Sequence, residues 1–564
     1  MKTLLKNGTV VNVFTDELQR ADVLMEGAKI TGVGDYTDAD ADTVEDVSGK
    51  YICPGFIDGH IHIESTMLTP LELAKMCLPC GTTSIVADPH EIANVCGVDG
   101  IKYMLEASRG LPMNVYFTLP SCVPATPFDE SGAILTAAEL EPLYADGRVV
   151  GLAEMMNYPG VLFGEEDVLK KISDAHAHGR GVDGHAPFLS GHDLDKYIAA
   201  GIKSDHECTN IDEAKEKLRR GQWIMIRNGT AARNLDALLP LFDPPYSHRC
   251  LLVTDDRHPA DISAEGHIDN IIRLAAKAGK SAVTGIQMAT IQAAQCFGLP
   301  YVGAIAPRYR ADVLVLDDLD SVQVRDVYSS GVKVVCGGKV ADIPTPAVSE
   351  DLKGRVYGSF NVNPLSAKDF YIKPKAARCN VIDVIHGELI TKKLVCDIDW
   401  SQGNGIDLDR DILKLAVIER HNGTGHRGLG FVHGIGLKRG AIASSVSHDS
   451  HNLIVIGTND GDMALAANHV RLGGGNAVVA DGKVIADMPL PVAGLMAEIS
   501  GEEIAKLNAD VREAVHALGA PRSIEPFMNM AFVSLPVIPS LKMTARGLVD
   551  VEKFCRISLY EEEN

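Results

Sequence analysis

The sequence predicts an α/β protein built around a TIM-like (β/α)₈ barrel, with a small composite β-sandwich domain and an extra C-terminal α/β domain. Three observations lead to this prediction. Eight short apolar runs, each ending in small or polar residues, recur between residues 53 and 306. Stretches with helical periodicity separate these runs. Alternating segments that are typical of antiparallel strands lie on both sides of this region.

The composition bounds the class of protein. At 564 residues the chain has room for roughly three to four average domains. Apolar residues make up 46% and charged residues 23%, which favours large buried cores over disorder. The net charge of −22 leaves no basic excess to neutralise phosphates, so we expect no nucleic-acid partner. Without a membrane-length apolar run or a secretion signal, we expect a cytoplasmic protein that binds no membrane.

The start of the chain indicates antiparallel strands. Runs such as TLLKNGTVVNV and ADVLMEGAKITGVG are short, and turns at Asn7-Gly8 and Glu26-Gly27 punctuate them. A similar pattern returns in ADVLVLDDLDSVQVRDVYSSGVKVVCGGKVA, residues 311–341. We therefore expect residues 1–52 and 307–345 to pair into one β-sandwich domain that the barrel interrupts.

Residues 53–306 carry the predicted barrel. The apolar runs are, in order, FIDGHIHIE, TTSIVADPHE, NVYFTLPS, VVGLAEMM, GRGVDGHAP, GIKSDHECT, WIMIRNG and CLLVTDDR. Segments such as PLELAKMCL, DVLKKISDAHAHG and IDEAKEKLRRG have helical periodicity or composition and lie between the runs. Eight strand–helix units over about 250 residues are typical of a (β/α)₈ barrel.

The pattern changes again in residues 346–564, after the proline-bearing segment DIPTPAVSEDLKG. Runs such as CNVIDVI, KLAVIER and NLIVIGT indicate strands, and GDMALAANHVRLGG and GEEIAKLNADVREAVHAL indicate helices. We expect a separate C-terminal α/β domain here.

Polar residues gather where the predicted barrel strands end, which is where this architecture places its chemistry. Side chains at positions i and i+2 of a strand share one face, so His60 and His62 are predicted to bind one cation together. Glu154, from the fourth strand, would bridge two cations. His185 and His206 would bind the second ion, and Asp255 would complete the first. The adjacent Asp256 is the rival of Asp255 for this role.

A two-metal centre lowers the pKa of a shared water until hydroxide forms near neutral pH. Asp255 would then take a proton during the attack and pass it to the leaving group. The alternative is that each polar group is an ordinary part of the barrel rim.

Two further groups have open roles. Asp88, His90 and Glu91 follow the second strand, and with Glu64 they would form an additional cation site, a substrate-recognition wall or a hydrogen-bonded polar network. The motif SHDSHN, residues 447–452, would bring His448, Asp449 or His451 over the barrel mouth as a lid, or would make an interdomain contact.

The barrel and its set of strand-end ligands resemble the amidohydrolase superfamily. Within it, PGFIDGHIHIEST, VADPHEIANVCG, DGHAP, SDHE and TDDR look like the bacterial and archaeal adenine deaminases. The segment RHNGTGHRGLGFVHGIGLKRGAIASSVSHDSHNLIVIGTND resembles the C-terminal domain that those enzymes add. The resemblance covers essentially the whole chain.

The resemblance implies hydrolysis of adenine to hypoxanthine and ammonia in purine salvage, at two divalent metal ions, Mn²⁺ or Fe²⁺ with Zn²⁺ as a third option. We also expect a homo-oligomer, a dimer. A hydroxide bridging the metals would attack C6 of adenine, and Glu207 or Glu91 would protonate N1.

Two other functions stay open. One is an amidohydrolase that opens a cyclic amide, and the other is a non-catalytic barrel that serves as a scaffold. Many binuclear amidohydrolases bridge their metals with a carboxylated lysine on the fourth strand, whereas VVGLAEMM offers only Glu154. This difference weakens the hypothesis that the protein opens a cyclic amide. The complete ligand set weakens the hypothesis of a non-catalytic scaffold.

Overall fold

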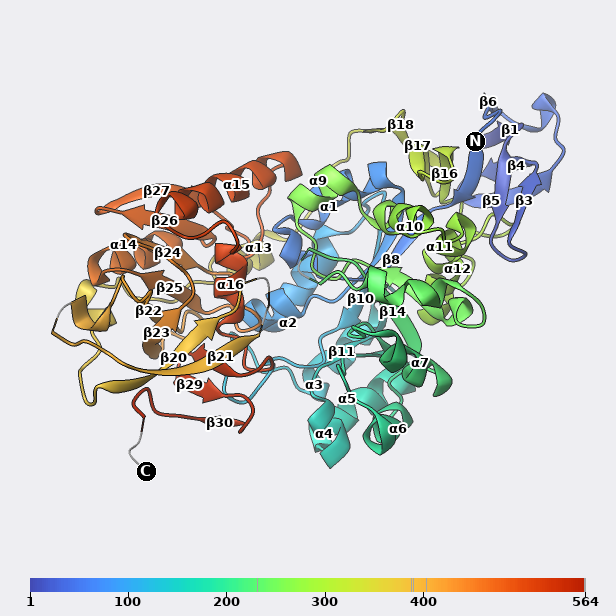
Figure 1. The fold of residues 1–564 in the computed structure, drawn as a ribbon. Helices are drawn as coiled ribbons and strands as arrows, with labels where there is room; N and C mark the ends of the chain where they lie inside the picture. The colour runs from blue at the N-terminus through green and yellow to red at the C-terminus, as the bar shows by residue number, and fades with distance from the viewer. Residues whose placement is uncertain (231, 387, 389, 402, 562–564) are drawn as a thin grey trace. The chain divides into compact units, whose positions relative to one another are not determined.

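The computed structural model describes residues 1–230, 232–386, 388, 390–401 and 403–561, and these residues form two compact units (Figure 1). Unit 1 consists of residues 1–89, 104–121 and 136–347. Unit 2 consists of residues 90–103, 122–135 and 348–564.

Unit 1 contains the predicted barrel of eight parallel strands. A five-stranded sheet has the order β12-β11-β10-β9-β8, and a three-stranded sheet has the order β13-β14-β15. Parallel bridges between Ile61 and Asp255 and between Val182 and Ile202 join the two sheets at both edges, which closes the ring. The strands are β8 (Phe56–Ile61), β9 (Thr82–Ala87), β10 (Asn114–Leu119), β11 (Val149–Met155), β12 (Gly181–Gly184), β13 (Ser204–Asp205), β14 (Trp223–Arg227) and β15 (Cys250–Val253).

The barrel strands are buried on both faces, as parallel strands covered by helices must be. Every residue of β8, β9 and β11 is buried. Helices α4, α7 and α11 begin at residues whose side chains accept a hydrogen bond from the first turn; the side chain of Asn210, for example, accepts one from the backbone N–H of Glu213 at 2.9 Å. The helices of unit 1 are α1 (Pro70–Cys77), α3 (Ala137–Leu140), α4 (Tyr158–Phe163), α5 (Glu166–Ala177), α6 (Gly191–Ala199), α7 (Ile211–Arg219), α8 (Leu235–Leu238), α9 (Pro259–Glu265), α10 (Ile268–Lys277), α11 (Ala282–Met288) and α12 (Ile291–Cys296). Helix α2 (His90–Ala107) begins in unit 2, and only its last residues belong to unit 1.

Unit 1 also contains two β-sheets outside the barrel: a four-stranded sheet from the N-terminal segment alone and a seven-stranded sheet that combines both segments flanking the barrel. One has the order β5-β4-β1-β6 and the other β19-β18-β17-β16-β7-β2-β3. Strand β7 pairs with β16 and β2, so chain segments about 260 residues apart share a sheet and a core that includes Val10, Ile52 and Val313. The strands are β1 (Lys2–Lys6), β2 (Thr9–Asn12), β3 (Glu17–Arg20), β4 (Asp22–Glu26), β5 (Lys29–Gly34), β6 (Thr43–Asp46), β7 (Tyr51–Pro54), β16 (Val313–Asp318), β17 (Gln323–Ser329), β18 (Val332–Cys336) and β19 (Lys339–Val340).

Unit 2 is built on an eight-stranded mixed sheet with the order β21-β20-β23-β22-β25-β24-β26-β27 (yellow to red in Figure 1). Helix α14 packs on β24, β25 and β26, and α15 packs on β26 and β27. The elements are α13 (Glu350–Tyr357), β20 (Arg378–Val384), β21 (Thr391–Asp397), β22 (Leu413–Ile418), β23 (Arg427–His433), β24 (Ala441–Ser444), β25 (Leu453–Gly457), α14 (Asp460–Val470), β26 (Asn476–Ala480), β27 (Lys483–Met488), α15 (Gly501–Ala517), α16 (Pro526–Phe532), β28 (Leu541–Thr544), β29 (Gly547–Asp550) and β30 (Cys555–Arg556).

Two segments of the predicted barrel domain, residues 90–103 and 122–135, belong to unit 2. Contacts within unit 2 explain this. The Glu130 carboxylate accepts hydrogen bonds from His426 Nδ1 and Arg546 Nη2, both at 2.8 Å, and the Glu130 carbonyl accepts one from Asn452 Nδ2 at 2.7 Å. These contacts join residues about 300 to 400 positions apart, which local sequence patterns do not reveal.

Across the described ranges, no helix combines the length and the apolar composition that crossing a membrane requires.

Gly184 provides a test of the barrel packing. A Cβ at this position would lie 2.2 Å from the backbone oxygen of Ser204 on the neighbouring strand β13, where little can shift. We expect Gly184→Ala to lower the thermal unfolding temperature by several degrees, since strain of this kind costs about 1–3 kcal/mol. The matched control is Gly147→Ala, whose Cβ would meet nothing within 4 Å. Equal unfolding temperatures for the two variants would contradict the described packing.

Candidate metal centre

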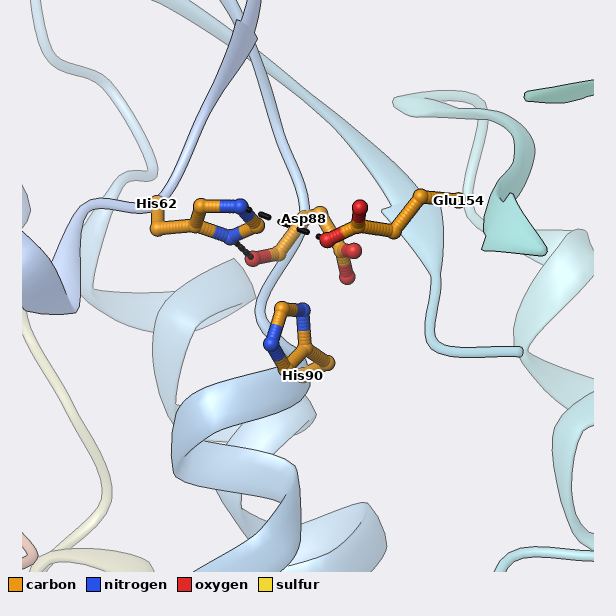
Figure 2. A group of neighbouring side chains, drawn as sticks. All are labelled: His62, Asp88, His90 and Glu154. Atoms are coloured by element: carbon orange, nitrogen blue, oxygen red, sulfur yellow. Dashed lines mark hydrogen bonds and ion pairs between the residues drawn. The ribbon is translucent and has the colours of Figure 1, made fainter. Parts of the chain in front are cut away.

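Six side chains of the predicted ligand set converge at the carboxyl ends of the barrel strands of unit 1. His60 lies on β8 and His62 follows it; Glu154 lies on β11; His185, His206 and Asp255 follow β12, β13 and β15. All are buried except His185, which is partly exposed. Figure 2 shows the side chain of His62 directed toward Glu154, with Asp88 beside them.

The first group within this set consists of His60, His62 and Asp255. Their ligand atoms lie within 4.8 Å of one another. Asp255 Oδ1 is 3.1 Å from His62 Nε2 and 3.8 Å from His60 Nε2. The three atoms therefore surround one small volume, as ligands of a single cation do.

The second group consists of His185 and His206, and Glu154 lies between the two groups. Glu154 Oε2 is 2.7 Å from His185 Nδ1 and 3.1 Å from His206 Nε2, whereas Oε1 is 3.4 Å from His62 Nε2. One carboxylate thus directs one oxygen to each histidine group. This is the arrangement that a ligand bridging two cations requires.

The facing ring nitrogens of His60 and His62 support the fit to a cation. His62 Nδ1 donates to the backbone oxygen of Asp88 at 3.2 Å, so its Nε2 is left to act as an acceptor or a ligand (Figure 2). That Nε2 faces His60 Nε2 at 3.2 Å. Two imidazole nitrogens that face each other this closely, in contact with carboxylates, are what a divalent cation would hold together. The residues therefore fit a metal centre.

The electrostatics of the site are those of tightly coupled opposite charges. Burial alone would raise the pKa of Glu154, but His185 and His206 hold it well below its ordinary value. Burial opposes the charge on His206 and His62 as well, yet the adjacent carboxylates raise both pKa values. The pKa of His60 is lowered, because burial and the neighbouring histidines outweigh the carboxylates. The carboxylates are ionised near neutral pH, as metal ligands must be.

The structure separates the neighbours Asp255 and Asp256. Asp255 has a left-handed backbone, with φ of 59°, and its N–H donates to the His60 carbonyl at 2.9 Å. This turn places its carboxylate against His62. Asp256 instead accepts a hydrogen bond from Ser65 Oγ at 2.5 Å. The geometry therefore favours Asp255 as the ligand.

Glu207, the predicted proton donor, lies at the edge of the second group. Its Oε1 is 3.3 Å from His206 Nε2 and 3.7 Å from His185 Nδ1. Its backbone N–H donates to Asp205 Oδ1 at 2.8 Å, which holds the turn after β13.

The sequence analysis missed two functional residues of this site. Arg227, the last residue of β14, forms ion pairs with both Glu207 and Asp255. Asp58, on β8, accepts hydrogen bonds from the backbone N–H groups of His60 and Thr254 at 3.2 and 3.1 Å, so it ties β8 to β15. The sequence contains a signal for each of them. Arg227 follows the apolar residues of the seventh run, where the other runs carry their polar groups, and Asp58 lies two residues before His60 on the same strand face.

Strand alternation does not extend as far as Glu64. Strand β8 ends at Ile61, and Glu64 begins a buried 3₁₀ turn, Glu64–Thr66, so the two-residue period stops before it. Asp88 behaves differently: its side chain lies within 4.8 Å of the ligand atoms of His62 and Glu154.

The remaining predicted residues, His90, Glu91, His448, Asp449 and His451, belong to unit 2, where they form a cluster. The Glu91 carboxylate contacts His448 Nδ1 and His451 Nε2. Because the backbone N–H of Ser447 donates to His451 Nδ1 at 3.2 Å, the proton of this neutral ring is on Nε2 and points at Glu91. His90 Nε2 lies 3.7 Å from Glu91 and 4.0 Å from Asp449. These contacts form a hydrogen-bonded network, and Glu91, His448 and His451 also lie close enough together to hold a cation, so the network and the additional cation site both stay predictions.

The bridging role of Glu154 leads to a test. Glu154→Gln removes one negative charge between the two histidine groups, so we expect the bound metal to fall well below two ions per chain, by about 10-fold or more in affinity. Elemental analysis of purified protein measures this. The control Glu166→Gln removes the same charge from the exposed first turn of α5 and should retain both ions. Two ions per chain in Glu154→Gln would rule out the bridge.

A second test separates the adjacent aspartates. Asp255→Asn should release metal and abolish activity, because its Oδ1 faces the first histidine pair. Asp256→Asn keeps a partner for Ser65 and should retain metal, with at most a small change in unfolding temperature. Metal titration of both variants measures the difference, and the reverse ranking would make Asp256 the ligand.

The comparisons with known proteins show which family the chain belongs to. Residues 51–341 match the amidohydrolase family, and residues 388–555 match the adenine deaminase C-terminal domain. The chain is 46% identical over 553 residues to adenine deaminase 2 of Carboxydothermus hydrogenoformans, covering 98% of this chain and 95% of that protein. It is 45% identical over 561 residues to the adenine deaminase of Desulfatibacillum aliphaticivorans, covering 99% and 97%.

Solved structures include a β-aspartyl dipeptidase from Fervidobacterium islandicum, with 17% identity and a TM-score of 0.48, covering 61% of this chain and all of that one. A dihydropyrimidinase from Brevibacillus agri has 18% identity and a TM-score of 0.46, covering 60% and 96%. The extent and identity of the sequence matches establish the family: the chain belongs to the amidohydrolases, and among them to the adenine deaminases that carry the additional C-terminal domain.

Proposed function

We propose that this chain hydrolyses adenine to hypoxanthine and ammonia. The observation that carries the proposal is the similarity to adenine deaminases, at about 45% identity over nearly the full length of both chains. The geometry supports it, because Glu154, with no lysine on β11, lies between two histidine groups. A glutamate bridge also argues against the cyclic-amide alternative, whose members are expected to use a carboxylated lysine.

One divalent cation would be held by His60, His62 and Asp255. The other would be held by His185 and His206. Glu154 would contact both cations. Mn²⁺ or Fe²⁺ is the proposed metal, with Zn²⁺ as the alternative. The two ions would acidify a water molecule so that it attacks near neutral pH. All other steps belong to the side chains of this chain.

Asp255 accepts one proton of the attacking water as the oxygen bonds to C6 of adenine. The electrons of the C6–N1 double bond move to N1, and Glu207 delivers the proton that N1 requires. Asp255 then passes its proton to the amino group, the C6–N bond breaks, and ammonia leaves. Water supplies both protons, so adenine plus water balances hypoxanthine plus ammonia.

The position of Glu207 makes it the better candidate for the N1 proton than Glu91. Its Oε1 lies 3.3 Å from His206 Nε2 of the candidate metal centre, whereas Glu91 belongs to unit 2 and contacts His448 and His451 there. The pKa of Glu207 is held low against the effect of burial, chiefly by Arg227, so it starts as a carboxylate. It therefore takes the proton from water before N1 receives it.

The test is ammonia release from adenine by protein loaded with Mn²⁺ or Fe²⁺, with metal content measured on the same sample. We expect turnover with adenine, and Glu207→Gln should lower kcat by about 10²–10⁴-fold while metal stays bound. No ammonia from any purine at full metal occupancy would refute the proposal. Ring opening of hydantoins or dihydropyrimidines would support the cyclic-amide function instead.

Assembly as a homodimer and a cytoplasmic location are further parts of the proposal. They rest on the resemblance to adenine deaminases and on the acidic composition, with a net charge of −22. Light scattering of the purified protein measures the first, and cell fractionation the second.

A further inference from the structure

Arg227 lies where it contacts the two carboxylates that transfer protons in the proposed reaction. Its Nη1 donates to Glu207 Oε1 and, at 2.6 Å, to Asp255 Oδ2. Its Nη2 donates to Glu207 Oε2 at 3.2 Å. One guanidinium therefore makes a two-pronged contact with Glu207 and a third contact with Asp255. Glu207 follows β13 and Asp255 follows β15, so this contact joins the strands on both sides of β14.

The guanidinium is itself held in place. The side chain of Arg227 is 9% exposed, and Nε donates to Asn234 Oδ1 at 3.2 Å. The backbone N–H of Asn234 in turn donates to the Arg227 carbonyl at 3.0 Å, which closes the loop after β14. A planar group that donates hydrogen bonds from all three of its nitrogens has little freedom to rotate. Its position is thus fixed before substrate arrives.

The contact also decides which oxygen of Asp255 faces the ligand group. Arg227 occupies Oδ2, and Oδ1 lies 3.1 Å from His62 Nε2. Without the guanidinium, no arginine charge would lie between the carboxylates of Glu207 and Asp255. Their like charges would then repel each other. Asp255 would then be free to turn Oδ2 toward the histidines.

From this geometry we propose that Arg227 is the positioning residue that holds Glu207 and Asp255 at the separation and orientation that the two proton transfers require. The inference rests on the proposed function for its catalytic consequence. Its structural part, a fixed cation in contact with both carboxylates, does not. A lysine would reproduce the charge but reach only one carboxylate at a time, because its ammonium lacks the planar fork.

The test compares three variants. Arg227→Ala should lower kcat for adenine by about 10²–10³-fold, and Arg227→Lys by a smaller factor, with KM changed much less than kcat. The control Arg233→Ala removes a half-exposed arginine that pairs with Asp261 and Glu265, and it should keep the wild-type rate. Metal content is measured on every sample.

Chemical rescue separates positioning from simple loss of structure. Guanidinium, added to Arg227→Ala far below denaturing concentrations, should restore kcat at least about 10-fold, since it refills the gap with the same charge and shape. Urea has a similar shape without the charge and should not restore it. Arg233→Ala should respond to neither.

A second readout does not depend on activity. Guanidinium should raise the thermal unfolding temperature of metal-free Arg227→Ala in a saturable way, because it binds between the two carboxylates. The wild type and Arg233→Ala should show no such rise. Wild-type activity in Arg227→Ala, or neither rescue nor a saturable rise, would overturn the inference. A wild type inactive on adenine whose Arg227→Ala variant still shows the rise would refute the proposed function alone.

Discussion

The carboxylate of Glu154 is the contact on which the rest of the site depends. One oxygen faces His62, and the other faces His185 and His206. The Glu154 side chain is 4% exposed, so its charge is costly unless cations or hydrogen-bond donors surround it. The histidines supply that environment, and they come from strands that surround Glu154 rather than from its own strand. Burying this carboxylate therefore requires that the barrel closes.

The closure of the barrel is in turn tied to the ligands. Asp255 pairs with Ile61 across the gap between β15 and β8, and its N–H bonds to the carbonyl of His60. Asp58 reinforces the same junction through Thr254, whose N–H and hydroxyl it accepts at 3.1 and 2.5 Å. The junction that closes the barrel therefore contains His60 and Asp255, two members of the first candidate ligand group. A change that loosens the junction loosens this group as well.

The site also shows how negative charge is managed. Glu154 and Asp255 are buried, Glu207 is partly buried, and each of the three carboxylates lies beside histidines or an arginine. Arg227 is a permanent cation between Glu207 and Asp255, whereas the charge on the histidines depends on protons or metal. A fixed charge keeps these carboxylates in place irrespective of what the histidines bind. In unit 2 the buried carboxylate of Glu91 has histidine partners instead of an arginine, because it contacts His448 and His451.

The sequence alone determined the eight barrel strands, the composite β-sheets and the first-group histidines, because each follows from a local pattern: buried runs, turn residues and polar strand ends in one register. It also determined the family through long motifs. Tertiary structure decided what local patterns do not encode. The left-handed turn at Asp255 separates it from Asp256. The 3₁₀ turn at Glu64 ends the strand alternation. Residues 90–103 and 122–135 join unit 2 through contacts with distant residues. Arg227 acquires its role only when β13, β14 and β15 lie side by side, because its two partners are 20 and 28 residues away in the chain.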